Sequence, residues 1–259
     1  MSAPAAYLFD LEGTLYEGET AVPGAAAALA RLRAAGVPYR LVTNTTSRSR
    51  AMLVARLQGL GFTVSAAEIF SPAVAAAELG RARGHTVVAA FVPRAALVDL
   101  QPLTTVGGTS GAPVGAPPTA VLVGDLGEAW TFALLQEAFT YLMAGAELIA
   151  LSRDRYFRRA DGIALDAGPF VIALEYAASI TATVAGKPSA DFFRAAVASL
   201  GVAGGARVVM VGDDLWTDVQ GAQRAGLEGW LVRTGKFRAD TLAASDVVPH
   251  RILGSVAEI

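Results

Sequence analysis

The chain has 259 residues, of which 53% are hydrophobic and 17% charged, with a formal net charge of −2 and no cysteine. This length and apolar content suffice for the core of one large domain or two modest ones. Lack of cysteine excludes disulfides and thiolate chemistry, and the balanced charge argues against a general nucleic-acid binder. With no signal-like N-terminus and only short apolar runs, we expect a cytoplasmic protein with no membrane partner.

The first 60 residues predict alternating strands and helices. Strands are predicted at 5–11, which is apolar apart from Asp10, and at 39–43, where Leu41 and Val42 precede polar residues. Such runs are typical of parallel strands covered on both faces. A helix is predicted after each strand, at 21–35 and at 47–60. This order predicts an α/β fold with a doubly wound parallel sheet, in which ligands bind beyond the carboxyl ends of the strands.

The pattern changes after residue 72. A Gly-, Pro- and Thr-rich segment at 102–118 shows little helix or strand potential, and α/β elements surround it. Helices are predicted there at 73–83, 129–143 and 169–179, and strands at 86–92, 120–123 and 147–151. We therefore predict an inserted α/β domain at 77–185, between two parts of a core domain, 1–76 and 186–259.

The core pattern resumes at Lys187. The remaining predicted elements are helices at 191–200 and 217–225, strands at 207–211, 229–232 and near 246–248, and a short terminal helix. The strand at 207–211 is apolar after Arg207, and Gly212 and two acids follow it. We expect this third strand to lie beside the first two in one sheet.

Reactive side chains follow the elements of this core at four points: Asp10 with Glu12, Thr43 with Asn44, Lys187, and Asp213 with Asp214 and Asp218. Asp10 and Glu12 are two positions apart, so on an extended segment they point the same way. Several carboxylates at one edge repel each other unless a cation lies among them, and oxygen ligands without His or Cys favour Mg²⁺. Thr43 and Lys187 supply donors to anionic oxygens, so the sequence predicts a phosphate held against a hard metal ion.

Within such a site Asp10 is the predicted nucleophile, because a carboxylate is ionised at neutral pH and its attack on phosphorus gives a reactive acyl phosphate. Glu12 would protonate the leaving group and then activate water. Each residue also has a structural interpretation. Lys187 could be a loop lysine, the pair at 43–44 a turn and the pair at 213–214 acids at a helix N-terminus, while Asp218 could equally lie on a helix surface.

The order of these motifs resembles the haloacid dehalogenase-like phosphohydrolases. The matching segments are Asp10-Leu11-Glu12-Gly13-Thr14, Val42-Thr43-Asn44, Lys187-Pro188 and Gly212-Asp213-Asp214 with Asp218. The insertion resembles the α/β cap of the NagD-like subclass, IIA. Residues 168–171 and 234–238 resemble the group called haloacid dehalogenase-like hydrolase domain-containing protein 2, and the likeness covers nearly the whole chain.

The resemblance implies a Mg²⁺-dependent phosphatase that acts on a small organic phosphate through an aspartyl-phosphate, with a cap that selects the substrate and a possible homodimer. It implies three groups of residues: phosphoryl-binding Thr43, Asn44 and Lys187, metal-binding Asp10, Asp213 and the backbone carbonyl of Glu12, and metal-orienting Asp214 and Asp218. No nucleic-acid or membrane partner is implied.

One residue departs from the family pattern, which has Asp where this chain has Glu12. The extra methylene could move the carboxyl by about 1 Å, and a misplacement of that size can cost on the order of a hundredfold in rate. Three interpretations stay open: a working acid/base, a slow phosphatase, or a protein that binds phosphate without turnover. Phosphoryl transfer between sugars is a further alternative from the same chemistry.

Two features of the insertion also stay open. Arg153, Arg155, Arg158 and Arg159 form a basic cluster that is either a solvated loop or a contact for a second anionic group of the substrate. Asp125 lies at the end of a predicted strand of the insertion and could face the active site.

Overall fold

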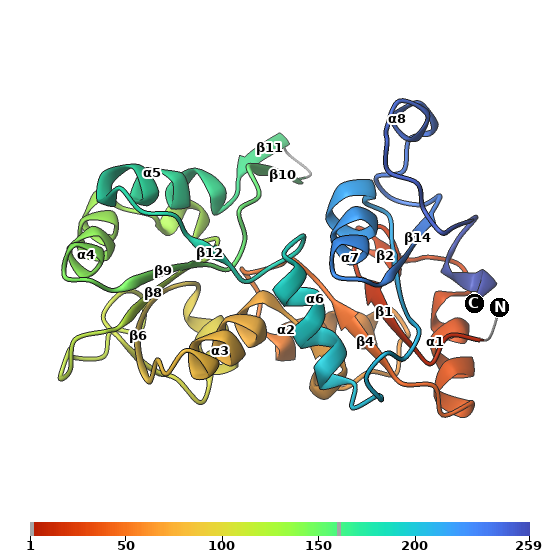
Figure 1. The fold of residues 1–259 in the computed structure, drawn as a ribbon, viewed down its shortest axis with the longest axis horizontal. Coiled ribbons are helices and arrows are strands. Elements are labelled where there is room, and N and C mark those ends of the chain that lie inside the picture. Colours follow the sequence, from red (N-terminus) through yellow and green to blue (C-terminus); the bar gives the residue numbers. More distant parts are fainter. Residues whose placement is uncertain (1–2, 160–161) are drawn as a thin grey trace. The chain divides into compact units, whose positions relative to one another are not determined.

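A computed structural model describes residues 3–159 and 162–259 and divides into two compact units (Figure 1). Unit 1 consists of Met1–Thr43, Ala51–Phe70 and Lys187–Ile259. Unit 2 consists of Asn44–Arg50 and Ser71–Gly186, so it takes in two short segments that the sequence analysis placed in the core domain. The functional labels of core and cap stay predictions for these units.

Unit 1 is built on a six-stranded sheet in the order β15-β14-β13-β1-β4-β5, and every pairing is parallel. The strands are β1 (Ala6–Asp10), β4 (Tyr39–Val42), β5 (Ile69–Phe70), β13 (Val208–Gly212), β14 (Glu228–Val232) and β15 (Arg251–Leu253). All five residues of β1 and of β13 are buried, as their unbroken apolar sequences predict. The predicted doubly wound α/β fold is confirmed.

The helical segments of unit 1 follow its strands along the chain. They are α1 (Ala25–Ala34), α2 (Arg50–Gly59, with Arg50 in unit 2), η1 (Ala66–Glu68), α6 (Ala190–Ser199), π-helical η4 (Leu215–Gln220), α7 (Gly221–Arg224), α8 (Ala239–Ala243) and η5 (Val256–Glu258). On one face of the sheet, Phe9, Leu41 and Val211 share a buried cluster with Leu29 of α1 and Leu53 of α2. This packing fixes the strand ends that carry the polar motifs.

A short antiparallel hairpin, which the sequence analysis did not predict, lies between β1 and α1. Its strands are β2 (Tyr16–Glu17) and β3 (Thr20–Ala21). Gly13 precedes it with φ 88°, a conformation that favours glycine, and its N–H donates to the Tyr16 carbonyl at 2.7 Å. The hairpin therefore begins directly after Asp10 and Glu12.

Unit 2 has a five-stranded parallel sheet in the order β12-β9-β8-β6-β7. Its strands are β6 (Val87–Phe91), β7 (Thr104–Val106), β8 (Ala120–Val123), β9 (Glu147–Ala150) and β12 (Thr183–Val184). Its helical segments are α3 (Pro72–Ala82), η2 (Arg94–Leu100), η3 (Gly127–Ala129), α4 (Phe132–Met143) and α5 (Gly168–Ala178). Helices α4 and α5 pack together over one face of the sheet (Figure 1).

Three details differ from the sequence predictions. Strand β7 lies inside the Gly-rich segment that had shown little strand potential, and the hairpin β10 (Tyr156–Arg159) with β11 (Gly162–Leu165) was not predicted. The prediction of a strand near 246–248 is wrong. Val247 packs into a cluster with Leu215 and Val219, and the strand that pairs with β14 is β15, later in the chain. Within the described part of the chain, no helix has the length and apolar character needed to cross a membrane.

Candidate active site

The carboxyl ends of three neighbouring strands bring the polar motifs of unit 1 to one edge of its sheet. Asp10 is the last residue of β1, which lies between β13 and β4. Thr43 directly follows β4, and Asp213 directly follows β13. All three residues are buried, with 8%, 4% and 3% of their surface exposed, so the sheet topology gathers polar groups in a site largely closed to water.

Lys187 joins two carboxylates at this edge. Its Nζ lies 2.5 Å from Asp10 Oδ1 and 2.7 Å from Asp218 Oδ1, and the lysine is only 3% exposed. Burial alone would lower the pKa of Lys187, but the charges of Asp10 and Asp218 outweigh it and raise this pKa well above its ordinary value. Lys187 is therefore held as an ammonium beside Asp10, and the interpretation as a solvated loop lysine does not apply.

Three carboxylates lie close enough to share one cation. Oxygens of Asp10, Asp213 and Asp218 all lie within 4.8 Å of one another, and all three residues are buried. Burial, reinforced by Asp10 and Asp218, raises the pKa of Asp213 to about 8, and burial raises the pKa of Asp218 to about 7 against the pull of Lys187. One ammonium does not balance three carboxylates, so this oxygen-only donor set fits a hard divalent cation such as Mg²⁺.

Two glycines from distant segments enclose the Asp213 carboxylate. A Cβ on Gly13 would lie 2.0 Å from Asp213 Oδ2 and one on Gly235 would lie 2.1 Å from it, and both residues have positive φ. The N–H of Lys236 donates to the same oxygen at 2.7 Å, and Thr234 Oγ1 donates to the Gly13 carbonyl at 2.5 Å. The segment at 234–238, which the sequence analysis used only for its resemblance, thus belongs to the site.

The two acids after Asp213 have different surroundings. Asp214 Oδ1 accepts from the N–H groups of Trp216 and Thr217 at the start of η4, and its Oδ2 pairs with Lys236 Nζ at 3.0 Å. Asp218 is 1% exposed and reaches Lys187, and a Cβ on Gly212 would lie 2.2 Å from its Oδ2. The surface alternative for Asp218 is therefore wrong, and Asp214 caps the helical segment.

Glu12 differs from the other carboxylates of the motif. It is exposed, and its Oε1 accepts a hydrogen bond of 2.9 Å from the N–H of Gly18, in the turn of the β2–β3 hairpin. It is not one of the three acids grouped above. Its carboxylate is therefore tied to the hairpin, and its catalytic role stays a prediction.

The remaining predicted residues belong to unit 2. Asn44 Nδ2 donates to Asp154 Oδ2 at 3.0 Å, and Asp125 Oδ1 accepts from the Gly127 N–H at 2.8 Å. Arg153 pairs with Glu175 at 2.6 Å across its own unit, which favours a structural role for this arginine. The side chains of Arg158 and Arg159 fall outside the described part of the structure. The phosphoryl-binding role of Asn44 stays a prediction.

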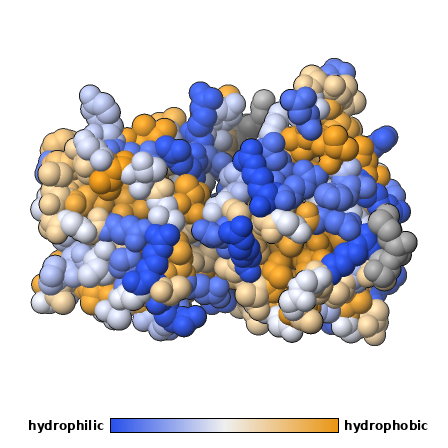
Figure 2. All heavy atoms as spheres, in the orientation of Figure 1, coloured by the Kyte–Doolittle hydropathy of each residue, from blue (hydrophilic) through white to orange (hydrophobic). Residues whose placement is uncertain are grey.

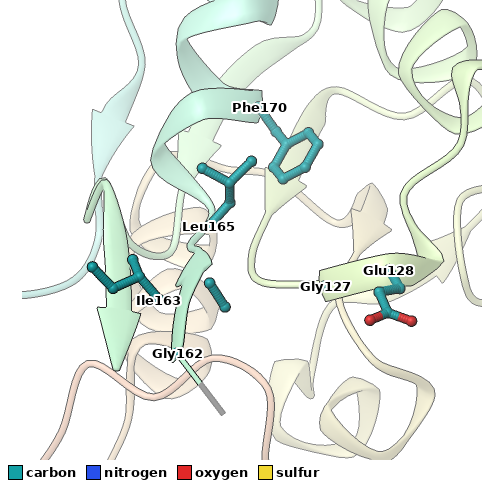
Figure 3. Close-up of a pocket in the computed structure, with 7 residues that line it drawn as sticks. Gly127, Glu128, Gly162, Ile163, Leu165 and Phe170 are labelled. Atoms are coloured by element: carbon teal, nitrogen blue, oxygen red, sulfur yellow. The ribbon is translucent and has the colours of Figure 1, made fainter. Parts of the chain in front are cut away.

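Unit 2 also contains a pocket of about 370 Å³ (Figure 3). Ile163 and Leu165 of β11 and Phe170 of α5 line it, together with Glu128 of η3. The ring of Phe170 stacks on Trp130 at 4.8 Å. Glu128 is the charged group among these described lining residues, so the pocket suits an apolar group better than a phosphate.

Two family models match the chain. One, described as haloacid dehalogenase-like hydrolase, matches residues 7–99, and one described as HAD-hydrolase-like matches residues 184–259. The chain is 44% identical over 234 residues to haloacid dehalogenase-like hydrolase domain-containing protein 2 of Homo sapiens, covering 90% of this chain and 86% of that protein. It is 38% identical over 257 residues to the phospholysine phosphohistidine inorganic pyrophosphate phosphatase of Homo sapiens, covering 97% and 91%.

Solved structures agree with this assignment. NagD from E. coli K-12 matches with a TM-score of 0.86 and 27% identity, covering all of this chain and 99% of NagD. The glycerol phosphate phosphatase Rv1692 from Mycobacterium tuberculosis, in complex with magnesium, matches with a TM-score of 0.85 and 28% identity, covering 98% and 75%. The chain, with its buried Asp10–Lys187–Asp218 arrangement, therefore belongs to the haloacid dehalogenase-like hydrolases, in their NagD-like subclass IIA.

Proposed function

We propose that this hydrolase is a Mg²⁺-dependent phosphatase that cleaves a small organic phosphate monoester through an aspartyl-phosphate. The observation that carries the proposal is the buried contact of Asp10 with Lys187, beside Asp213 and Asp218. Support also comes from the relatives named as phosphatases and from the magnesium complex of the glycerol phosphate phosphatase.

Asp10 is the proposed nucleophile. A carboxylate oxygen of Asp10 forms a bond to phosphorus as the ester P–O bond breaks, and the leaving alkoxide takes a proton from Glu12. Water then attacks the phosphorus of the aspartyl-phosphate, loses a proton to Glu12, and releases phosphate with Asp10 restored. The buried ammonium of Lys187 lies against Asp10 and would offset charge on the phosphoryl oxygens, while Thr43 can donate a hydrogen bond to them.

The proposed metal ligands are Asp10, Asp213 and the backbone carbonyl of Glu12. Asp214 and Asp218 would orient the metal and its ligands without being ligands themselves. When bound, Mg²⁺ would offset negative charge on the phosphoryl group and orient it. The three buried carboxylates fit such an ion because they cannot all ionise without a cation. Asp218 would also fix Lys187, since one ammonium contacts both Asp10 and Asp218.

A small substrate is favoured over a polymeric one. The net charge is −2, and Figure 2 shows hydrophilic and hydrophobic residues interspersed over the visible face of each unit. Nucleic-acid binding depends on an excess of basic residues along one face. We therefore propose a low-molecular-weight phosphate ester as substrate, to be found by a panel of such esters with Mg²⁺.

The test of this function is the substitution Asp10→Asn. It removes the nucleophile while nearly preserving side-chain volume, so Mg²⁺-dependent phosphate release should be abolished. Asp191→Asn is the matched control, because Asp191 is an exposed acid of the same unit that pairs with Arg194, away from the buried group. Full activity in the Asp10→Asn protein would refute the proposed mechanism.

A further inference from the structure

Arg56 of α2 holds the β2–β3 hairpin through three contacts. Its Nη2 donates to the Gly18 carbonyl at 2.6 Å, and its Nη1 pairs with Glu19 at 3.0 Å. Its guanidinium carbon lies 4.9 Å from the centroid of the Tyr16 ring, within the range of a cation–π contact. One arginine thus binds the first strand and the turn of the hairpin.

The peptide groups of Gly18 connect Arg56 to the candidate acid/base. The Gly18 N–H donates to Glu12 Oε1 at 2.9 Å, and the carbonyl of the same residue accepts from Arg56. Gly18 has φ 54°, and no other atom lies within 4 Å of where its Cβ would be. The position of Gly18 therefore depends on hydrogen bonds rather than on side-chain packing.

Apart from Arg56, the contacts that hold the hairpin involve its first strand, where Glu17 Oε1 accepts a hydrogen bond of 2.5 Å from the Gly235 N–H. The hairpin consists of two residues in each strand, and a two-stranded hairpin is marginal in water without outside contacts. Tyr16 anchors its first strand, being 3% exposed, but Glu17 to Glu19 are exposed. The contacts of Arg56 reach the turn itself, at Gly18 and Glu19, so we expect them to control where Gly18, and with it Glu12, lies.

We propose that Arg56 is a positioning residue for Glu12. It fixes the Gly18 peptide, whose N–H holds the Glu12 carboxylate where it can deliver a proton to the leaving group. The longer side chain of Glu12 suits this contact, which links the departure from the family pattern to the hairpin beside it. The inference rests on the proposed function, because it assigns a role within the same reaction.

The test compares two substrates that differ in their need for a general acid. p-Nitrophenolate leaves without a proton, whereas the alkoxide of glycerol phosphate needs one. We expect Arg56→Ala to lower kcat/KM for glycerol phosphate by about ten- to a hundredfold, and kcat/KM for p-nitrophenyl phosphate by less than about threefold. The ratio kcat/KM is the quantity compared, because it does not include the later hydrolysis of the aspartyl-phosphate, in which Glu12 serves both substrates alike. Arg56→Lys, which can still donate to the Gly18 carbonyl, should recover part of the loss and also serves if Arg56→Ala does not fold.

Two comparisons isolate the role. In a Glu12→Gln background, which keeps the acceptor for Gly18 but carries no transferable proton, Arg56→Ala should leave the ratio of the two kcat/KM values unchanged. Arg33→Ala is the control, since Arg33 pairs with Glu68 at 2.8 Å, donates to the Thr63 carbonyl at 2.6 Å and lies 5.8 Å from the Tyr39 ring. That variant should not change the ratio either.

An equal loss of kcat/KM for both substrates would leave their ratio unchanged and would overturn the positioning role. The same change of this ratio in the Glu12→Gln background would also overturn it. A higher rate for glycerol phosphate in Arg56→Ala would also overturn it, by showing that the hairpin holds Glu12 away from the leaving group. Failure of the proposed function would look different. In that case the unaltered protein would release no phosphate from either ester, or Asp10→Asn would keep the activity.

Discussion

Removing the Lys187 ammonium should destabilise the protein in a pH-dependent way. Lys187→Met keeps an apolar stem of similar size but leaves the buried carboxylates of Asp10 and Asp218 without the cation that lies 2.5 and 2.7 Å from them. Breaking a buried ion pair by removing one partner costs about 3–5 kcal/mol. We expect a loss of that size in the free energy of unfolding near pH 8, measured without divalent cations.

The loss should shrink as the pH falls. Without Lys187 the folded-state pKa of Asp218, already raised to about 7, rises further above its unfolded value. A carboxyl with a raised folded pKa favours the fold at low pH, and that advantage disappears as pH rises through the folded pKa. Near pH 5 Asp218 can take up a proton, and the cost should fall to about 1–2 kcal/mol.

Urea unfolding followed by circular dichroism at the two pH values measures both quantities. The double variant Lys187→Met/Asp218→Asn provides the control, because it removes one of the stranded charges and should recover at least about 1 kcal/mol. An unfolding free energy equal to that of the unaltered protein, or a loss independent of pH, would refute the proposed electrostatic role of Lys187.

Four other outcomes follow from the structure. The pKa of metal-free Asp213 is raised to about 8, so below that pH Mg²⁺ must displace a proton to bind. The apparent affinity for Mg²⁺ should therefore weaken by up to about tenfold for each unit by which the pH falls. The Mg²⁺-induced rise in Tm should accordingly be smaller near pH 6.5 than near pH 8.5. Gly13→Ala would place a Cβ 2.0 Å from Asp213 Oδ2 and should weaken Mg²⁺ binding at least about tenfold by calorimetry, whereas Gly36→Ala, also at positive φ but in open space, should leave it unchanged. Burial, with Asp154 and Asp125 nearby, raises the pKa of Asp166 to about 6, so the ionised form of Asp166 opposes folding. Asp166→Asn should therefore raise the free energy of unfolding by about 1–2 kcal/mol near pH 8 but by little near pH 4. An equal gain at both pH values would contradict this. Glu12→Asp should shorten the reach to the hairpin and lower kcat for an alkyl phosphate about tenfold, and a faster enzyme would show instead that Glu12 impairs turnover.

The chain-order pattern was sufficient for the central strands of unit 1. Three largely apolar runs, each followed by polar residues, correspond to the central strands β1, β4 and β13. A strand buried on both faces must be apolar throughout, and parallel strands place their carboxyl ends at one edge, so the motif positions follow from the pattern. That reasoning uses only local sequence and the general rules of sheet topology.

The sequence pattern was less informative where contacts between distant segments decide the local structure. Strands as short as β2, β3 and β7 carry too few residues for a periodic signal, and their pairing is set by neighbours distant in sequence. Val247 reads as part of a strand, yet burial against Leu215 and Val219 leaves it in a loop. Arg56 gave no signal in the sequence, because its partners lie about 40 residues earlier in the chain.

The sequence by itself determined the family, the parallel α/β architecture and the acids and lysine of the motif, because residue type and spacing fix which chemistry each strand end can offer. The tertiary structure alone decided which partner each of those groups contacts. Asp218, which sequence could not distinguish from a surface acid, turns inward to Lys187, while Asp214 caps η4 and Glu12 turns to Gly18. The physical reason is that burial and the distances between charges set hydrogen-bond partners and pKa values, and both arise only when segments far apart in the sequence meet.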